Sequence, residues 1–96
     1  MTIWKYVLEI TDVQEIEVPL TATALHIAEQ HGQLCMWALV DEDEETEVKR
    51  FVIVGTGNPA PRPDQGVHLG SALMHGGSLV WHVFQELPQD SIFRQK

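Results

Sequence analysis

The sequence has little of what several common classes of protein require. Its one cysteine, Cys35, excludes an internal disulfide framework and a thiolate zinc cluster. Six Lys and Arg residues stand against 14 Asp and Glu residues, which leaves a formal net charge of −8. Phosphate backbones are bound by clustered basic side chains, so this balance argues against nucleic acid as a partner. No apolar run reaches the ~18 residues of a membrane span, which argues against a membrane partner.

The first ten residues also lack the basic and then apolar layout of a secretory signal peptide. Together with the single cysteine, this leads us to expect a cytoplasmic protein. Hydrophobic residues make up 44% of the chain, which is ordinary for one globular domain. The acidic surface suits a soluble protein, and it would also suit a decoy that competes for a basic site on another protein.

Alternating and β-branched segments fill most of the chain and predict an all-β fold. About seven short, mostly antiparallel strands with tight turns indicate a small sandwich or barrel, and their close succession favours a meander order. We expect residues 1–86 to form a single domain and residues 87–96 a C-terminal tail, with Ile92 and Phe93 as a small apolar anchor. The expected strands are residues 3–10, 14–18, 20–30, 32–40, 48–54, 67–74 and 76–86.

Two of these segments have a further interpretation. Residues 20–30 would also suit a helix that is capped by a threonine and ended by Gly32. The alternation of Leu25 and Ile27 favours a strand instead. Gly70 lies inside a weaker strand pattern, which suggests a bulge or a position at the edge of a sheet.

Two similar stretches predict the turns and the centre of the fold. His31-Gly32 and His75-Gly76 are each followed by a tryptophan, Trp37 and Trp81, at the same spacing. Glycine adopts positive φ at little cost, so both dipeptides suit two-residue hairpin turns. The similarity is either an internal repeat or chance. The prediction of two hairpins does not depend on which of these is correct. We expect the two tryptophan strands to form the packed middle of the sheets.

The loop after residues 48–54 is the first candidate binding site. A strand that ends in Gly55-Thr56-Gly57 exposes backbone N–H groups, and such groups bind anions. Asn58 adds side-chain donors, and Arg62 adds a positive charge. These residues predict a site for a small anionic, nucleotide-like ligand held between subunits. A proline follows at once, and dinucleotide and P-loop fingerprints are absent, so a purely structural turn is the competing interpretation.

The histidines suggest a weaker alternative, a metal site. Metal ligation needs three or four convergent donors, and scattered surface histidines are the competing interpretation. Adjacent positions on a hairpin would bring His68 and His82 close together, which allows a two-histidine site with a glutamate nearby. We expect no cofactor. The five histidines are His26, His31, His68, His75 and His82.

The remaining reactive groups do not point to an enzyme. Cys35 lies inside an apolar run and is expected to be an inert core thiol. Ser71 and Ser78 lack the motif of a nucleophile elbow. The acidic run at residues 41–47 lacks the spacing of an EF-hand loop.

Four stretches carry a resemblance to a known group of proteins. They are Ile3 to Tyr6, Leu34 to Asp41, Gly55 to Gly57, and Leu79 to Phe84. As a set, they resemble a family of small, uncharacterised bacteriophage and prophage proteins, over nearly the whole chain up to Glu86. The resemblance implies a phage-encoded cytoplasmic accessory protein with no assigned activity. It also favours a role in countering host defence, which small phage proteins often have.

Three hypotheses about function follow. The leading one is a non-enzymatic accessory protein that acts by protein–protein interaction, as a homo-oligomer, on a host protein. Edge strands of a small β domain gain partners when they pair across chains, which is the physical reason to expect an oligomer. The second hypothesis is an oligomer that sequesters the small anionic ligand. The third is a metal-dependent enzyme that uses His68 and His82.

Overall fold

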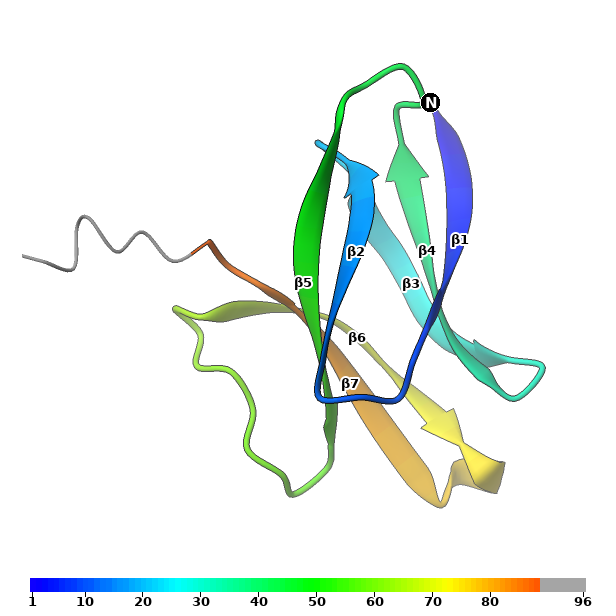
Figure 1. Ribbon diagram of the computed structural model, residues 1–96. Helices are drawn as coiled ribbons and strands as arrows, with labels where there is room; N and C mark the ends of the chain where they lie inside the picture. Colours follow the sequence, from blue (N-terminus) through cyan, green and yellow to red (C-terminus); the bar gives the residue numbers. More distant parts are fainter. Residues whose placement is uncertain (89–96) are drawn as a thin grey trace, which may run out of the picture.

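The computed structural model of the chain describes residues 1–88, and the predicted apolar anchor of the tail lies outside the described residues. Seven strands in two antiparallel sheets confirm the predicted all-β fold (Figure 1). A single turn of 3-10 helix, η1, joins the last two strands. The elements are β1 (Thr2–Leu8), β2 (Val13–Pro19), β3 (Thr23–Gln30), β4 (Gln33–Val40), β5 (Thr46–Gly55), β6 (Gly66–Met74), η1 (His75–Gly77) and β7 (Leu79–Glu86).

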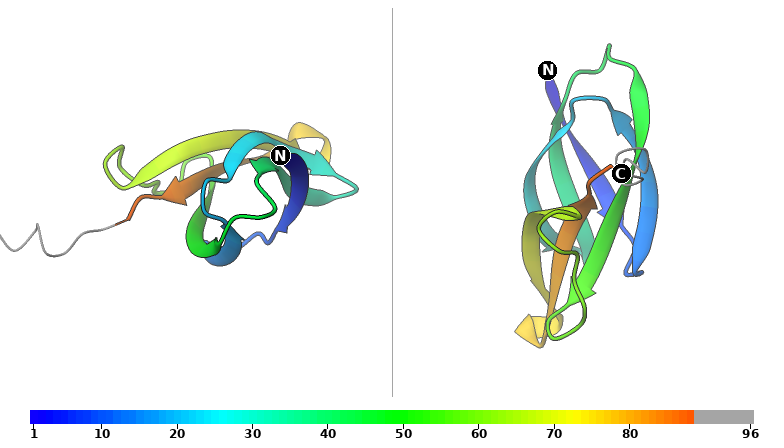
Figure 2. Two further views of the ribbon diagram at one scale, coloured as in Figure 1. Left: turned by 90° about the horizontal axis from the view of Figure 1, so that it is seen from above. Right: turned by 90° about the vertical axis from the view of Figure 1, so that its left-hand side faces the viewer.

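The order of the strands differs from the predicted meander. The three-stranded sheet has the order β1-β4-β3, and the four-stranded sheet has the order β2-β5-β7-β6. Strands β1 and β2 therefore belong to different sheets, which Figure 2 shows in two further views. Each strand carries apolar side chains on its inner face, and placement in opposite sheets lets these two faces meet across a shared core. The side chain of Gln14 fixes the connecting turn through bonds to the backbone N–H (3.0 Å) and carbonyl (2.7 Å) of Glu9.

Strand alternation follows the prediction closely in β2 and only partly in β1. In β2, Val18 is buried, whereas Glu15 and Glu17 are exposed. In β1, Leu8 joins the core, but Trp4 on the same face is 39% exposed.

Residues 23–30 form a strand, as predicted, but one bulge changes which side chains it buries. The pairing of β3 with β4 shifts its register between Ala24 and His26. Such an extra residue interrupts the alternation of faces. Leu25 is therefore 51% exposed while Ile27 is 4% exposed, although regular alternation would place both on one face.

The two predicted hairpin turns have different outcomes. His31 (φ 54°) and Gly32 (φ 79°) form a two-residue turn with both φ values positive, which is the type I′ geometry. The prediction of a two-residue turn at His75-Gly76 is wrong, because residues 75–78 separate β6 from β7. The backbone N–H and the hydroxyl of Ser78 both donate to the carbonyl oxygen of His75, and these bonds close the longer turn.

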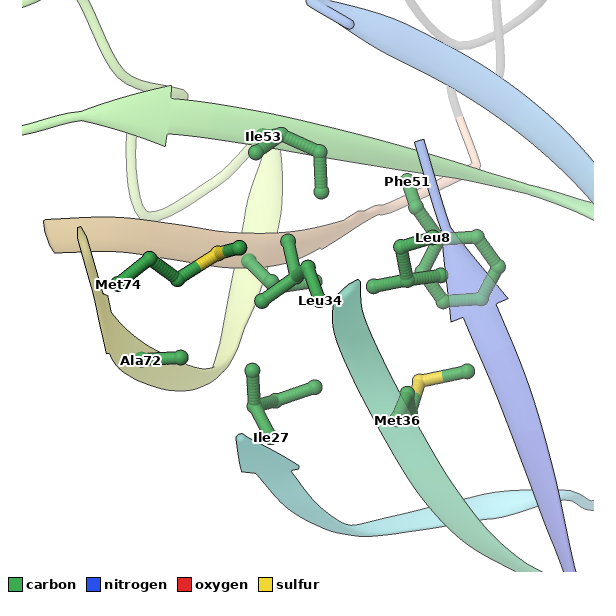
Figure 3. Close-up of a cluster of buried hydrophobic side chains, with 9 residues drawn as sticks. Leu8, Ile27, Leu34, Met36, Phe51, Ile53, Ala72 and Met74 are labelled. Carbon is green, nitrogen blue, oxygen red and sulfur yellow. The ribbon is translucent and has the colours of Figure 1, made fainter. Parts of the chain in front are cut away.

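The core contains side chains from both sheets (Figure 3). Strand β4 is the middle strand of its sheet and β7 is an interior strand of the other, so the tryptophan strands are central, as predicted. The side chains of Trp37 and Trp81 are themselves half-buried. The buried cluster consists of Leu8, Ile27, Leu34, Met36, Phe51, Ile53, Ala72, Met74 and Val83.

The two sheets come closest where β3 crosses β6. Gly70 lies at the bulge in β6, which is also an edge strand, and both features match the prediction. A Cβ atom built on Gly70 would lie 2.8 Å from Cγ1 of Ile27. The sheets nevertheless remain separate over the described residues, so the fold is a sandwich and not a closed barrel. Residues 1–88 include no helix with the length and apolar character needed to cross a membrane.

Candidate functional site

The loop proposed for anion binding is a tight turn that uses its own backbone donors. The N–H of Asn58 donates to the carbonyl oxygen of Gly55 at 3.1 Å. The N–H of Thr56 donates to the carbonyl oxygen of Val80 at 3.4 Å. Gly57 supplies the positive φ, +94°, that such a turn requires at its third residue. Two of the N–H groups that would hold an anion are therefore already bonded.

The side chains of this loop diverge. The hydroxyl of Thr56 contacts Nε2 of His82 at 2.8 Å. The amide nitrogen of Asn58 lies on the other face of the sheet, next to the ring of Trp81. A Cβ atom built on Gly55 would lie 3.2 Å from each of them. That face belongs to an open groove of about 530 Å³, which Gly55, Asn58 and Trp81 line together with the turn at residues 10–13.

Arg62 does not join the loop either. Its Nε atom pairs with Asp64 at 3.4 Å, and both side chains are more than three-quarters exposed. Neither Arg62, Thr56 nor Gly57 lines the groove. The structure thus distributes the five predicted residues over two faces and a separate loop.

His68 and His82, in contrast, are brought together. Their ring centres are 6.3 Å apart, and the hydroxyl of Ser71 lies between them. It is 2.7 Å from Nδ1 of His82 and 3.0 Å from Nε2 of His68. The register pairs Ser71 with His82, and the bulge before Gly70 puts Ser71 and His68 on the same face.

With Thr56, these residues form one hydrogen-bonded chain, which we call the histidine cluster: Thr56, His82, Ser71 and His68. It lies on the outer face of the four-stranded sheet, because the neighbouring residue Val83 points into the core. Each hydroxyl can donate or accept a hydrogen bond, so the hydrogen-bonded chain is satisfied with either tautomer of His82. The ring of Phe84 flanks it, with its centre 5.2 Å from that of His68.

Ser71 is the member of the cluster that the sequence analysis missed. No nucleophile motif surrounds Ser71, so the sequence alone gives no reason to place it in a site. The useful signal was instead the pairing of β6 with β7, which sets Ser71 opposite His82. That pairing depends on the length of the turn between the strands, and this turn is longer than the predicted two residues.

The histidine cluster of one chain has too few ligands to hold a metal ion by itself. Among the described residues, no three His, Cys, Asp or Glu side chains are placed to hold a metal ion. The other histidines lie elsewhere: His26 is against Trp37, with ring centres 5.8 Å apart, and the remaining two are in turns. One chain therefore offers two imidazoles at this point.

A second feature is the exposed edge of the three-stranded sheet at β1. Ile3 (56% exposed) and Val7 (46%) are on its outer face, and Trp4 (39%) is on its inner face. Strand β1 contains no Asp or Glu, although the chain has 14 of them. Its one charge, Lys5, reaches across β4 and donates to the side-chain oxygen of Gln30 at 2.8 Å.

The other edges of the two sheets are protected. Strands β3 and β6 both contain bulges, and they lie against each other at Gly70. Strand β2 carries Glu15 and Glu17 and ends at Pro19. Natural sheets use bulges, charges and prolines to prevent pairing with other chains. Among the described strands, β1 is the edge with the fewest such features.

Comparison with known proteins identifies a family to which no activity is assigned. The model of a domain of unknown function, DUF7352, matches residues 1–92. The chain belongs to this family. No curated protein and no solved structure matches it. The DUF7352 domain thus covers almost the whole chain.

Proposed function

We propose that this DUF7352 protein is a non-enzymatic interaction protein that self-associates through β1. The observation that supports the proposal is an apolar, acid-free edge strand on a chain of net charge −8. An edge strand offers unpaired N–H and C=O groups, and its apolar side chains gain cross-strand neighbours when another strand is added.

The charge distribution favours a second copy of the chain as the occupant of this edge. A basic partner would be attracted to acidic groups, and β1 has none. A second β1 is equally apolar, and antiparallel pairing about a twofold axis makes the two edges self-complementary. The two three-stranded sheets would then form one continuous sheet of six strands. Repulsion between the acidic remainders of the two chains opposes this dimer, so added salt should strengthen it.

Mass measurement of the purified chain tests the proposal. Light scattering after gel filtration should give twice the chain mass of 10.8 kDa. Ile3→Glu and Val7→Glu place carboxylates on the exposed edge and should return the mass to that of a monomer. Val48→Glu is the matched control, because Val48 is 56% exposed on the other sheet. A monomeric wild-type chain, or a dimer that both edge variants leave intact, would refute the proposal.

Hydrogen exchange distinguishes edge pairing from other contacts. Amides of β1 that point away from β4 should exchange slowly in the dimer and quickly in Ile3→Glu. Equal exchange in both proteins would show that the contact lies elsewhere.

We further propose that the dimer is a phage-encoded accessory protein that binds a host protein in the cytoplasm and counters host defence. The support for this step is the resemblance of the four sequence stretches to phage proteins. A tagged chain recovered from infected cells should carry one host protein, in an amount that Ile3→Glu alters and that the control Val48→Glu leaves unchanged. Recovery of the tagged chain alone would count against it.

A further inference from the structure

The histidine cluster has a geometry that a purely structural contact does not need. The ring nitrogens of His68 and His82 converge on a single point, which the hydroxyl of Ser71 occupies at 3.0 and 2.7 Å. Neutral imidazole nitrogens are common ligands of divalent zinc, copper and nickel. The two rings come from adjacent strands, so the sheet holds them in a fixed relation.

We propose that His68 and His82 form half of a zinc site that a second copy of the chain completes. Zinc is almost always held by four ligands in a tetrahedron, and one chain supplies two at this point. The cluster lies on an outer face, and His68 and Ser71 belong to the edge strand β6 and are exposed. Two copies that meet through this face would supply four imidazoles to one ion.

The surroundings suit such a contact. Leu73 lies on the same face as Ser71 and is 64% exposed, and the half-buried Val80 is its cross-strand neighbour. The nearest acidic group along β7 on this face is Glu86, which is paired with Arg50 at 3.1 Å. A zinc ion would offset part of the repulsion between two chains of charge −8.

Thr56 has a defined role in this site. A histidine that binds a metal usually donates its other ring N–H to a neighbouring group, which fixes the tautomer. The hydroxyl of Thr56, 2.8 Å from Nε2 of His82, can accept a hydrogen bond from that N–H and leave Nδ1 free to bind the metal. Thr56 is therefore a positioning residue rather than a ligand.

The movement needed to bind zinc is small. A zinc–nitrogen bond is about 2.0–2.1 Å long, so two imidazoles on one tetrahedral ion have ring centres roughly 5 Å apart. The centres of His68 and His82 are 6.3 Å apart. Rotation of the two histidine side chains would bring their ring centres to the shorter distance. The hydroxyl of Ser71 would turn towards solvent to make room for the ion.

Titration of the metal-free chain with zinc chloride tests the site. Calorimetry should show half an equivalent of zinc per chain, and the mass should at least double relative to the same protein in EDTA. His68→Ala and His82→Ala should abolish both effects, and the milder His68→Gln covers the case in which an alanine variant fails to fold. His26→Ala should leave both effects unchanged, because His26 lies on the other sheet.

The same experiment distinguishes dimerisation through zinc from dimerisation through the β1 edge. In Ile3→Glu, which should be monomeric in EDTA, zinc should still produce a dimer. Thr56→Ala should weaken zinc binding at least severalfold, and Thr56→Ser should restore it. One zinc per chain without a change of mass, no binding, or binding that survives His68→Ala and His82→Ala would overturn the proposal.

Discussion

Replacement of Gly70 by alanine tests the closest approach of the two sheets. The added Cβ atom would lie 2.8 Å from Cγ1 and 2.9 Å from Cβ of Ile27, whereas ordinary contacts begin near 3.4 Å. These two atoms are near the backbone of β3 and cannot swing aside as the end of a long side chain can. The strands must therefore separate by about 0.6 Å, or Ile27 must leave its place in the core.

The magnitude follows from two opposing effects. Overpacking of a well-filled core costs about 1–3 kcal/mol. Without the clash, Gly→Ala in an extended segment would stabilise the fold by roughly 0.4–1 kcal/mol, because the unfolded chain loses freedom. The difference between the two effects leads us to expect that Gly70→Ala lowers the free energy of unfolding by about 1 kcal/mol. That is a measurable fraction of the roughly 5–14 kcal/mol available to a domain of this size.

Urea unfolding, followed by the fluorescence of the three tryptophans, measures this change. Combination with Ile27→Ala, which removes Cγ1, should cost about 1 kcal/mol less than the sum of the single changes. Ile27→Val retains Cβ and Cγ1, so its combination with Gly70→Ala should be additive and serves as the control. A Gly70→Ala chain that is as stable as the wild type, or a cycle with Ile27→Ala that is additive, would contradict the close approach of Gly70 to Ile27.

Two further substitutions test local features. The hydroxyl of Tyr6 is buried without a hydrogen-bond partner among the described residues, so Tyr6→Phe should raise the free energy of unfolding by about 1 kcal/mol in urea. Burial also raises the pKa of Tyr6 above its ordinary 10.0, so the associated stability is complete below pH 10 and is lost as pH rises through the raised value. Tyr6→Phe should lack this alkaline loss, and identical pH profiles for the two proteins would contradict the assignment. Gly57→Ala, at φ +94° with no atom within 4 Å of the new Cβ, should cost about 1 kcal/mol through backbone strain alone. Gly57→Asn should cost less, because asparagine tolerates positive φ, and equal costs for the two variants would exclude strain as the cause.

Only part of the histidine cluster could be predicted from the sequence. The proximity of His68 and His82 could be anticipated, because two segments of one hairpin must pair. The participation of Ser71 could not, since it depends on the bulge beside Gly70 and on the register of β6 against β7. Thr56 enters the cluster from the turn after β5, and only the order of the strands places that turn beside His82.

Local chemistry in the sequence was enough to determine the number of strands, their approximate limits and the turn at His31-Gly32. Alternation of apolar side chains has a period of two residues, and a type I′ turn needs positive φ at two residues, so both can be recognised within a few residues. The tertiary structure alone decided that β1 pairs with β4 and β2 with β5. It also decided that Leu25 is exposed and that β1 remains an open edge. These outcomes depend on which apolar faces meet across the core, and that is a property of the whole chain rather than of any one segment.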